Sequence, residues 1–257
     1  MTRPCLASVR RHHAAACRGD AEAVHQIRIA LTRFRAARKF FAAMTRDAAW
    51  PKLEAAIDWL DSALGAARDS DVATGYASTK LRDHLDARDG ADLARQVRQT
   101  HRRLASVLRS KRCDHLIAAL EQWIDNGPWR TAGSASEEKR RNQPLADYAP
   151  DRLRQWKHRL ARNSVGSLGK ERWRHRLRIA AKRYRYMREA LAAIGLPERR
   201  TGLRERVAAQ SVQKALGDLR DLQRFRKVRF RSVGAKFYRR RKKQLLHKAK
   251  DALRQFA

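Results

Sequence analysis

Basic residues recur at helical spacing near the start of the chain, around the segment VHQIRIALTRFR at residues 24–35. Placed on an α-helix, five polar and basic side chains between residues 25 and 39 form one column, within about 80° of arc and roughly 21 Å long. Arginine forks bind phosphate oxygens through two hydrogen bonds, and lysine acts as a point charge. This column therefore indicates a site for a linear polyanion, and its members are His25, Arg28, Thr32, Arg35 and Lys39.

The segment RHRLRIAAKRYR at residues 174–185 repeats this pattern. Lysine replaces the threonine of the first column, so the second column has no gap; it consists of His175, Arg178, Lys182 and Arg185. Both columns are nearly free of acidic residues at the i,i+4 positions that usually neutralise a helix surface. Because stacked like charges destabilise a helix slightly, the repeated pattern favours ligand binding over a merely solvated surface.

A second signature, Leu-Gly-x-x-Arg-Asp, follows each column about 40 residues later, in ALGAARDSDV at 63–72 and ALGDLRDLQR at 215–224. Its glycine permits close packing of helices, and its aspartate can pair with an arginine of the column and hold that arginine in position. This structural role is the favoured interpretation. In the alternative, the arginines of the second signature, Arg68 and Arg220, belong to the anion site itself.

Two signatures in the same order, at nearly the same separation, indicate an internal duplication. Glycine and proline are scarce, at 12 and 6 residues, and sustained period-two alternation is absent, so we expect an all-α fold. We predict a single domain over 4–257 made of two pseudo-symmetric four-helix bundles. Repeat 1 covers about 4–126, a loop covers 127–147, and repeat 2 covers about 148–257.

Apolar residues beside the first column predict the face that the helix buries, because they recur at steps of three and four. They are Val24, Ile27, Leu31 and Phe34. The eight helices that we expect in all cover 4–18, 20–46, 50–88, 90–126, 148–165, 168–196, 200–232 and 234–256.

The net charge of +34 is far outside the ordinary balance of globular proteins and indicates a polyanionic partner. Residues 148–257 contain 34 basic and eight acidic residues, a net charge of +26, whereas residues 1–128 have a net charge of only +7. The second column is therefore predicted to bind more strongly than the first. No stretch approaches the about 20 apolar residues of a membrane-spanning helix, so we expect no membrane partner.

The histidines of the columns, His25 and His175, allow two roles, as core residues or as donors to phosphate, and both roles stay open. Neither has a second metal ligand at i+4, and we predict no metal and no other cofactor. Phosphoryl transfer normally needs metal-binding carboxylates, but the acidic pair Asp69 and Asp71 has Gln223 at its second position in repeat 2. We therefore expect a protein that is not an enzyme.

The duplicated pattern His-x-x-Arg-[Ile/Val]-Ala-x-[basic]-Arg-x-Arg, followed by Leu-Gly-x-x-Arg-Asp, resembles the CHAD family, the conserved histidine α-helical domain. The resemblance extends from about residue 4 to 257. It implies two pseudo-symmetric four-helix bundles and a basic surface or groove that binds inorganic polyphosphate. Thr32 departs from the family, which usually has a basic residue there. Carried over by position, the family's basic residues are His25, Arg28, Arg33, Arg35, His175, Arg178, Lys182, Arg183 and Arg185.

The predicted function is non-enzymatic binding of inorganic polyphosphate. The three cysteines include no CxxC pair, which favours a reducing, cytoplasmic compartment, and association with polyphosphate granules is a further expectation. The alternative is a basic helical protein that binds nucleic acid, because a pI near 11.5 meets the first criterion for one. Against it, the chain has no recognisable DNA-reading motif and no strand platform for stacking bases, so we expect nucleic-acid binding to be weak.

Overall fold

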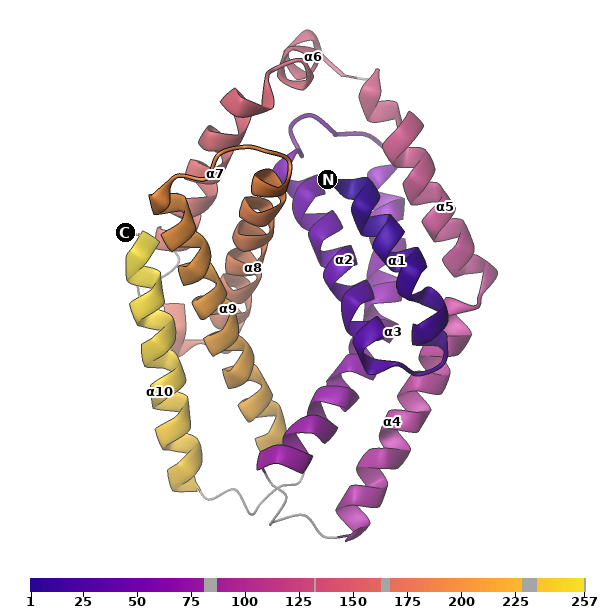
Figure 1. Ribbon diagram of the computed structural model, residues 1–257, viewed down its shortest axis with the longest axis vertical. Coiled ribbons are helices and arrows are strands. Elements are labelled where there is room, and N and C mark those ends of the chain that lie inside the picture. The colour runs from indigo at the N-terminus through magenta and orange to yellow at the C-terminus, as the bar shows by residue number, and fades with distance from the viewer. Residues whose placement is uncertain (81–86, 132, 163–166, 228–234, 257) are drawn as a thin grey trace. The chain divides into compact units, whose positions relative to one another are not determined.

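The computed structural model describes residues 1–80, 87–131, 133–162, 167–227 and 235–256, and they are almost entirely helical (Figure 1). Within these ranges there is no strand, so the predicted all-α fold class is confirmed. The chain divides into two compact units, Met1–Asn142 and Gln143–Ala257. The internal duplication stays a prediction. No described helix is both long enough and apolar enough to cross a membrane.

The first unit contains one more long helix than we expected. The prediction of a single helix over 90–126 is wrong, because the chain breaks at Ser110, whose hydroxyl accepts a hydrogen bond from the backbone N–H of Cys113 at 3.3 Å. Serine favours such N-cap positions. The helices of this unit are α1 (Thr2–Cys17), α2 (Ala21–Phe40), α3 (Trp50–Lys80), α4 (Ala87–Leu108), α5 (Lys111–Asn126) and α6 (Ala135–Arg141).

The core of the first unit lies among helices α1 to α5. The apolar stripe predicted beside the first column is confirmed, because Ile27, Leu31 and Phe34 are each at most 2% exposed. Aromatic rings extend this core: the Phe34 ring stacks on Trp50 with centroids 6.2 Å apart. The face of α2 that is buried in the core is therefore distinct from the face that carries the column.

The second unit consists of α7 (Leu145–Arg162), α8 (Glu171–Ala193), α9 (Arg200–Lys227) and α10 (Ala235–Leu253). Helix α9 packs against both α8 and α10, and α7 packs against α8. The segment predicted as a loop, 127–147, is partly helical: α6 lies within it and α7 begins at Leu145. Ser134 and Glu137 form a capping box at the start of α6, which explains why this polar segment folds.

A buried carboxylate connects three helices of the second unit. Oε2 of Glu205 on α9 accepts hydrogen bonds from the Tyr184 hydroxyl and from Arg188, both on α8. Its Oε1 lies 3.2 Å from the Lys157 ammonium on α7. Burial alone would raise the pKa of Glu205, but the hydrogen bonds from Tyr184 and Lys157 and the charge of Arg188 together lower it. The ionised carboxylate therefore stabilises the packing of α7, α8 and α9.

Candidate functional site

Each unit brings its two signatures together on packed helices. The first unit has its column on α2 and its second signature on α3, and these helices are in contact. The second unit has the corresponding segments on α8 and α9, which are also in contact. In each pair, one helix therefore carries the column, and the helix with the second signature packs against it.

In the first unit the second signature supports Arg28 through its backbone. Nη1 of Arg28 donates to the carbonyl oxygen of Leu64 at 3.4 Å. A Cβ atom at Gly65 would lie 3.2 Å from the same Nη1, so the glycine leaves room for the guanidinium. Nε of Arg28 is 4.0 Å from Oδ1 of Asp61, one turn earlier on α3. The packing role that we predicted for the glycine is thus visible at this position.

Two aspartates that the sequence did not suggest as site residues neutralise the first column. Arg35 is 19% exposed, and its Nη1 lies 3.2 Å from Oδ2 of Asp61. Its Nη2 bonds to Asp58. At the gap in the column, the hydroxyl of Thr32 is used within its own helix: it donates to the backbone oxygen of Arg28 at 2.8 Å. The first column is therefore held in ion pairs by α3, and its positive charge is partly cancelled.

In the second unit the charges of Arg178 and Arg220 both act on His175, and we call these three residues the cation cluster. His175 is exposed, and its pKa is lowered from the ordinary value, first by partial burial of the ring and then by the charges of Arg178 and Arg220. Because Arg178 is on α8 and Arg220 is on α9, both signatures contribute to this positive region. An anion placed here would favour the protonated ring of His175, which the two arginines disfavour.

Arg185 has a mainly structural environment. Its side chain is 15% exposed and bonds to Glu189 one turn further along α8. Its Nε donates to Oε1 of Gln213 on α9 at 3.1 Å, and its guanidinium lies 4.5 Å from the ring centroid of Tyr186. In the repeat register Gln213 stands where the first unit has Asp61. The second unit therefore supports its column with a neutral amide at this position.

The remaining predicted residues are distributed around these groups. His25, Arg68 and Arg183 are half-buried, whereas Lys39 and Arg33 are exposed; Lys182 has its ammonium 5.6 Å from the Tyr186 ring. Arg33 lies about 140° around α2 from Arg28. It is close enough to Cys5 of α1 for its charge to oppose the increase that burial causes in the pKa of that thiol. The structure therefore does not bring Arg33 to the column, and the same helical geometry places Arg183 off the second one.

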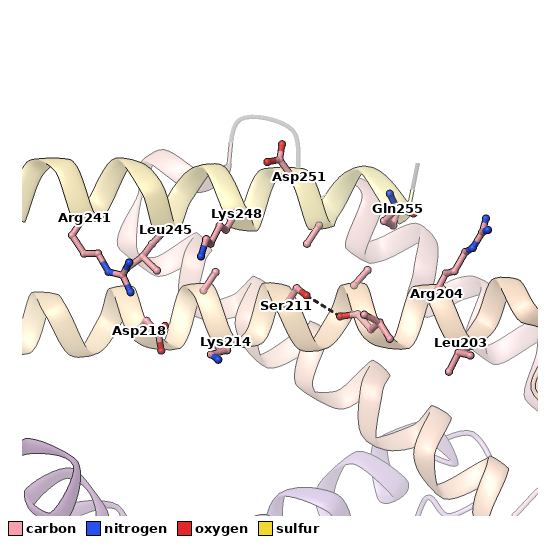
Figure 2. Close-up of a pocket in the computed structure, with 14 residues that line it drawn as sticks. Leu203, Arg204, Ser211, Lys214, Asp218, Arg241, Leu245, Lys248, Asp251 and Gln255 are labelled. Atoms are coloured by element: carbon pink, nitrogen blue, oxygen red, sulfur yellow. Dashed lines mark hydrogen bonds between the residues drawn. The ribbon is translucent and has the colours of Figure 1, made fainter. Parts of the chain in front are cut away.

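No group of His, Cys, Asp or Glu residues in the described ranges could hold a metal ion. A cavity of about 910 Å³ forms a groove between α9 and α10 (Figure 2). Its walls are mixed: Leu203 and Leu245 are apolar, Arg241 and Lys248 are basic, and Asp218 is acidic. None of the predicted site residues lines this groove. The predicted site residues therefore lie outside this groove.

Comparisons with known proteins agree with these signatures. The family model of the CHAD domain matches residues 1–229, which include both copies of both signatures. The crystal structure of the CHAD domain from the plant Ricinus communis is similar to this chain, with a TM-score of 0.74 at 24% sequence identity; the match covers 99% of this chain and 89% of that chain. No curated protein matches the sequence. By its signatures, its helical fold and the extent of the family match, the chain belongs to the CHAD domain family.

Proposed function

We propose that this protein binds inorganic polyphosphate without catalysing a reaction, and that the cation cluster of the second unit is the stronger part of the site. The observation that supports this most is that the charges of Arg178 and Arg220, on two packed helices, both act on the ring of His175. Cations fixed on packed helices lose little conformational freedom when a ligand binds, which favours affinity.

The two units differ in the charge that they offer to a polyanion. Arg28 and Arg35 of the first unit lie against the carboxylates of Asp58 and Asp61. Gln213 replaces one of these carboxylates in the second unit, and residues 148–257 have a net charge of +26. A polyphosphate chain would bind by charge pairing and release of its counterions. Such a protein would concentrate on polyphosphate granules in the cytoplasm.

A competition experiment tests this proposal. Labelled polyphosphate is bound to the full chain at physiological salt, and unlabelled polyphosphate, duplex DNA, RNA or heparin is added at equal phosphate or sulfate concentration. We expect polyphosphate to compete best, and log affinity to fall linearly and steeply with log salt concentration. If duplex DNA displaces polyphosphate at equal phosphate concentration, the protein is a nucleic-acid binder and the proposal fails. A nearly flat salt dependence would also contradict it.

The pH dependence of binding shows whether His175 contacts the ligand. The pKa of its ring is lowered from the ordinary 6.5 by burial and by Arg178 and Arg220, so the ring is neutral in the free protein at pH 7. A bound phosphate favours the imidazolium, so we expect affinity to increase as the pH falls from about 8 to about 6. His175→Gln should lose this increase. Titration of both proteins at constant ionic strength measures it, and an identical pH dependence would assign His175 to the fold alone.

A further inference from the structure

A second cavity, of about 440 Å³, opens in the first unit between the turn that follows α1 and one face of α4. Its volume is typical of pockets that hold small ligands. No residue of either signature lines it. Four arginines do: Arg18 from the turn, Arg98 and Arg102 from α4, and Arg109 directly after the end of α4.

Arg98 and Arg102 share one face of α4, because positions i and i+4 lie about 40° apart. Arg109 continues this face, since its backbone N–H still bonds to the Ala105 carbonyl at 3.0 Å. Arg109 is held by the turn, with its Nη2 donating to the carbonyl oxygen of Cys17 at 3.3 Å. Arg98 and Arg102 are exposed and make no ion pair with any residue in the described ranges. Their i,i+4 spacing is repulsive, so an anion in the cavity would stabilise this face.

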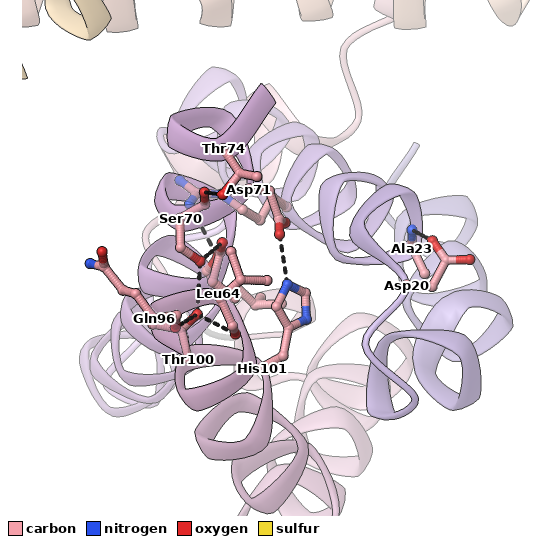
Figure 3. A network of polar contacts seen from close by, with 12 residues as sticks. Asp20, Ala23, Leu64, Ser70, Asp71, Thr74, Gln96, Thr100 and His101 are labelled. Carbon is pink, nitrogen blue, oxygen red and sulfur yellow. Dashed lines mark hydrogen bonds and ion pairs between the residues drawn. The ribbon is translucent and has the colours of Figure 1, made fainter. Parts of the chain in front are cut away.

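A buried histidine contributes an unused polar atom to the same cavity. His101 is only 8% exposed, and its Nε2 lies 2.7 Å from Oδ1 of Asp71. Its Nδ1 is buried and has no hydrogen-bond partner among the described residues. Figure 3 shows this nitrogen on the side of the ring that faces away from Asp71. A Cβ atom at Gly19 would lie 3.8 Å from Nδ1, so the turn passes within van der Waals distance of this side of the ring, and both residues line the cavity.

The hydrogen bond to Asp71 decides what Nδ1 can do. A carboxylate only accepts, so Nε2 of His101 carries the proton and donates it. In the neutral ring Nδ1 then offers a lone pair. A phosphate group with one protonated oxygen can donate to that lone pair while its other oxygens accept from arginines. Sulfate has no such proton at neutral pH, and neither has a phosphate in the interior of a polyphosphate chain.

We propose that this cavity is a second anion site, separate from the columns, which binds a compact, terminal phosphate group through Arg18, Arg98, Arg102 and Nδ1 of His101. The ligand is inorganic phosphate or the end of a polyphosphate chain, which share this chemistry. The proposal does not depend on polyphosphate binding at the cation cluster, because all of its residues belong to the first unit.

Nitrogen NMR of the histidine rings in the full chain tests this site locally. The Nδ1 signal of His101, assigned by its absence in His101→Gln, should shift saturably when inorganic phosphate is added at constant ionic strength. Sulfate should bind at least about tenfold more weakly, because it leaves the lone pair of Nδ1 without a donor. Equal affinity for sulfate and phosphate would overturn the proposal.

Two double variants separate the cavity from the general charge of the unit. Arg98→Gln with Arg102→Gln should weaken the phosphate-induced shift about tenfold or more. Arg11→Gln with Arg103→Gln removes the same charge from exposed positions outside the cavity and should change it less than about twofold. Equal effects of the two pairs would refute the site.

Polyphosphate of two lengths distinguishes the sources of the ligand. At equal total phosphate, a short chain provides more ends than a long one. If the His101 shift follows the concentration of ends and is lost in the Arg98 and Arg102 double variant, chain ends occupy the cavity. If the shift follows the concentration of inorganic phosphate alone, the free ion occupies the cavity. A shift that follows total phosphate at every length would contradict recognition of a terminal group. Substitutions at Arg178 or Arg220 should leave the shift unchanged, whether or not they affect polyphosphate binding elsewhere.

Discussion

Replacing Arg178 and Arg220 with glutamine is expected to weaken polyphosphate binding about 100-fold at physiological salt. Each guanidinium can form charge-assisted hydrogen bonds with phosphate that are worth roughly 1.5–3 kcal/mol, or about tenfold in affinity. The two arginines lie near His175 in the cation cluster, on α8 and α9. Fluorescence anisotropy with labelled polyphosphate measures the loss, and circular dichroism checks that the helices remain.

The matched control replaces Arg28 and Arg68, which hold the same positions in the first unit, and removes the same charge. We expect a loss of less than about tenfold, because Arg28 already contacts Asp61 and the Leu64 carbonyl. Equal losses would show that net charge, and not the cation cluster, determines binding. Arg35 and Arg185 are unsuitable for this comparison, since both are mostly buried and already bond to other side chains.

Replacing Glu205 with glutamine is expected to lower the free energy of unfolding of the second unit by about 3–5 kcal/mol, because it leaves two half-buried cations without their carboxylate. Those cations are Arg188 and Lys157, whose side chains are 18% and 33% exposed, against 11% for Glu205. Urea denaturation monitored by circular dichroism measures the change. Asp151→Asn is the control: its pair with Arg154 is 67% exposed on both sides, so its loss should be below about 1 kcal/mol.

The effect of this substitution should also depend on pH. The pKa of Glu205 is lowered in the folded protein from an ordinary 4.5. Burial alone would raise this pKa, but the hydrogen bonds from Tyr184 and Lys157 and the charge of Arg188 outweigh it. Its stabilising contribution is therefore complete above about pH 4.5 and is lost as the pH falls through the lower folded value. The difference between the wild type and Glu205→Gln should shrink in acid. A difference that stays constant down to pH 2 would contradict an ionised Glu205.

Periodicity and repetition in the sequence were sufficient to predict the all-α fold, the buried stripe of Ile27, Leu31 and Phe34, and the segments that carry the columns. These features depend on local spacing, which the sequence contains directly. The break at Ser110 was missed because one serine in a helix-forming segment is as compatible with a helix surface as with a cap. Only the hydrogen bond to Cys113 distinguishes the two.

The partners of the column could not be predicted because they depend on how one helix is placed against another. The pairing of the second signature's own aspartates with column arginines stays a prediction. The bonds of Arg35 go to Asp58 and Asp61, two or more turns earlier on α3 than the aspartate of that signature. Their spacing of three residues is the one signal that could have indicated a shared helix face. The meeting of His175 with Arg220 likewise depends on the register of α8 against α9.

The acidic residues of the second unit are few, and the most buried of them are used internally. Glu189, Glu198 and Glu205 are at most 24% exposed, and each pairs with an arginine or lysine of its own unit. These inner pairs are poorly screened by salt, whereas the excess cations outside repel one another through solvent. Added salt should therefore make the free protein more resistant to heat while it weakens the proposed binding of polyphosphate. A polyanion bound along this surface would supply the negative charge that the unit has few acidic residues to provide. It would thereby reduce the repulsion among the surface cations and stabilise the fold.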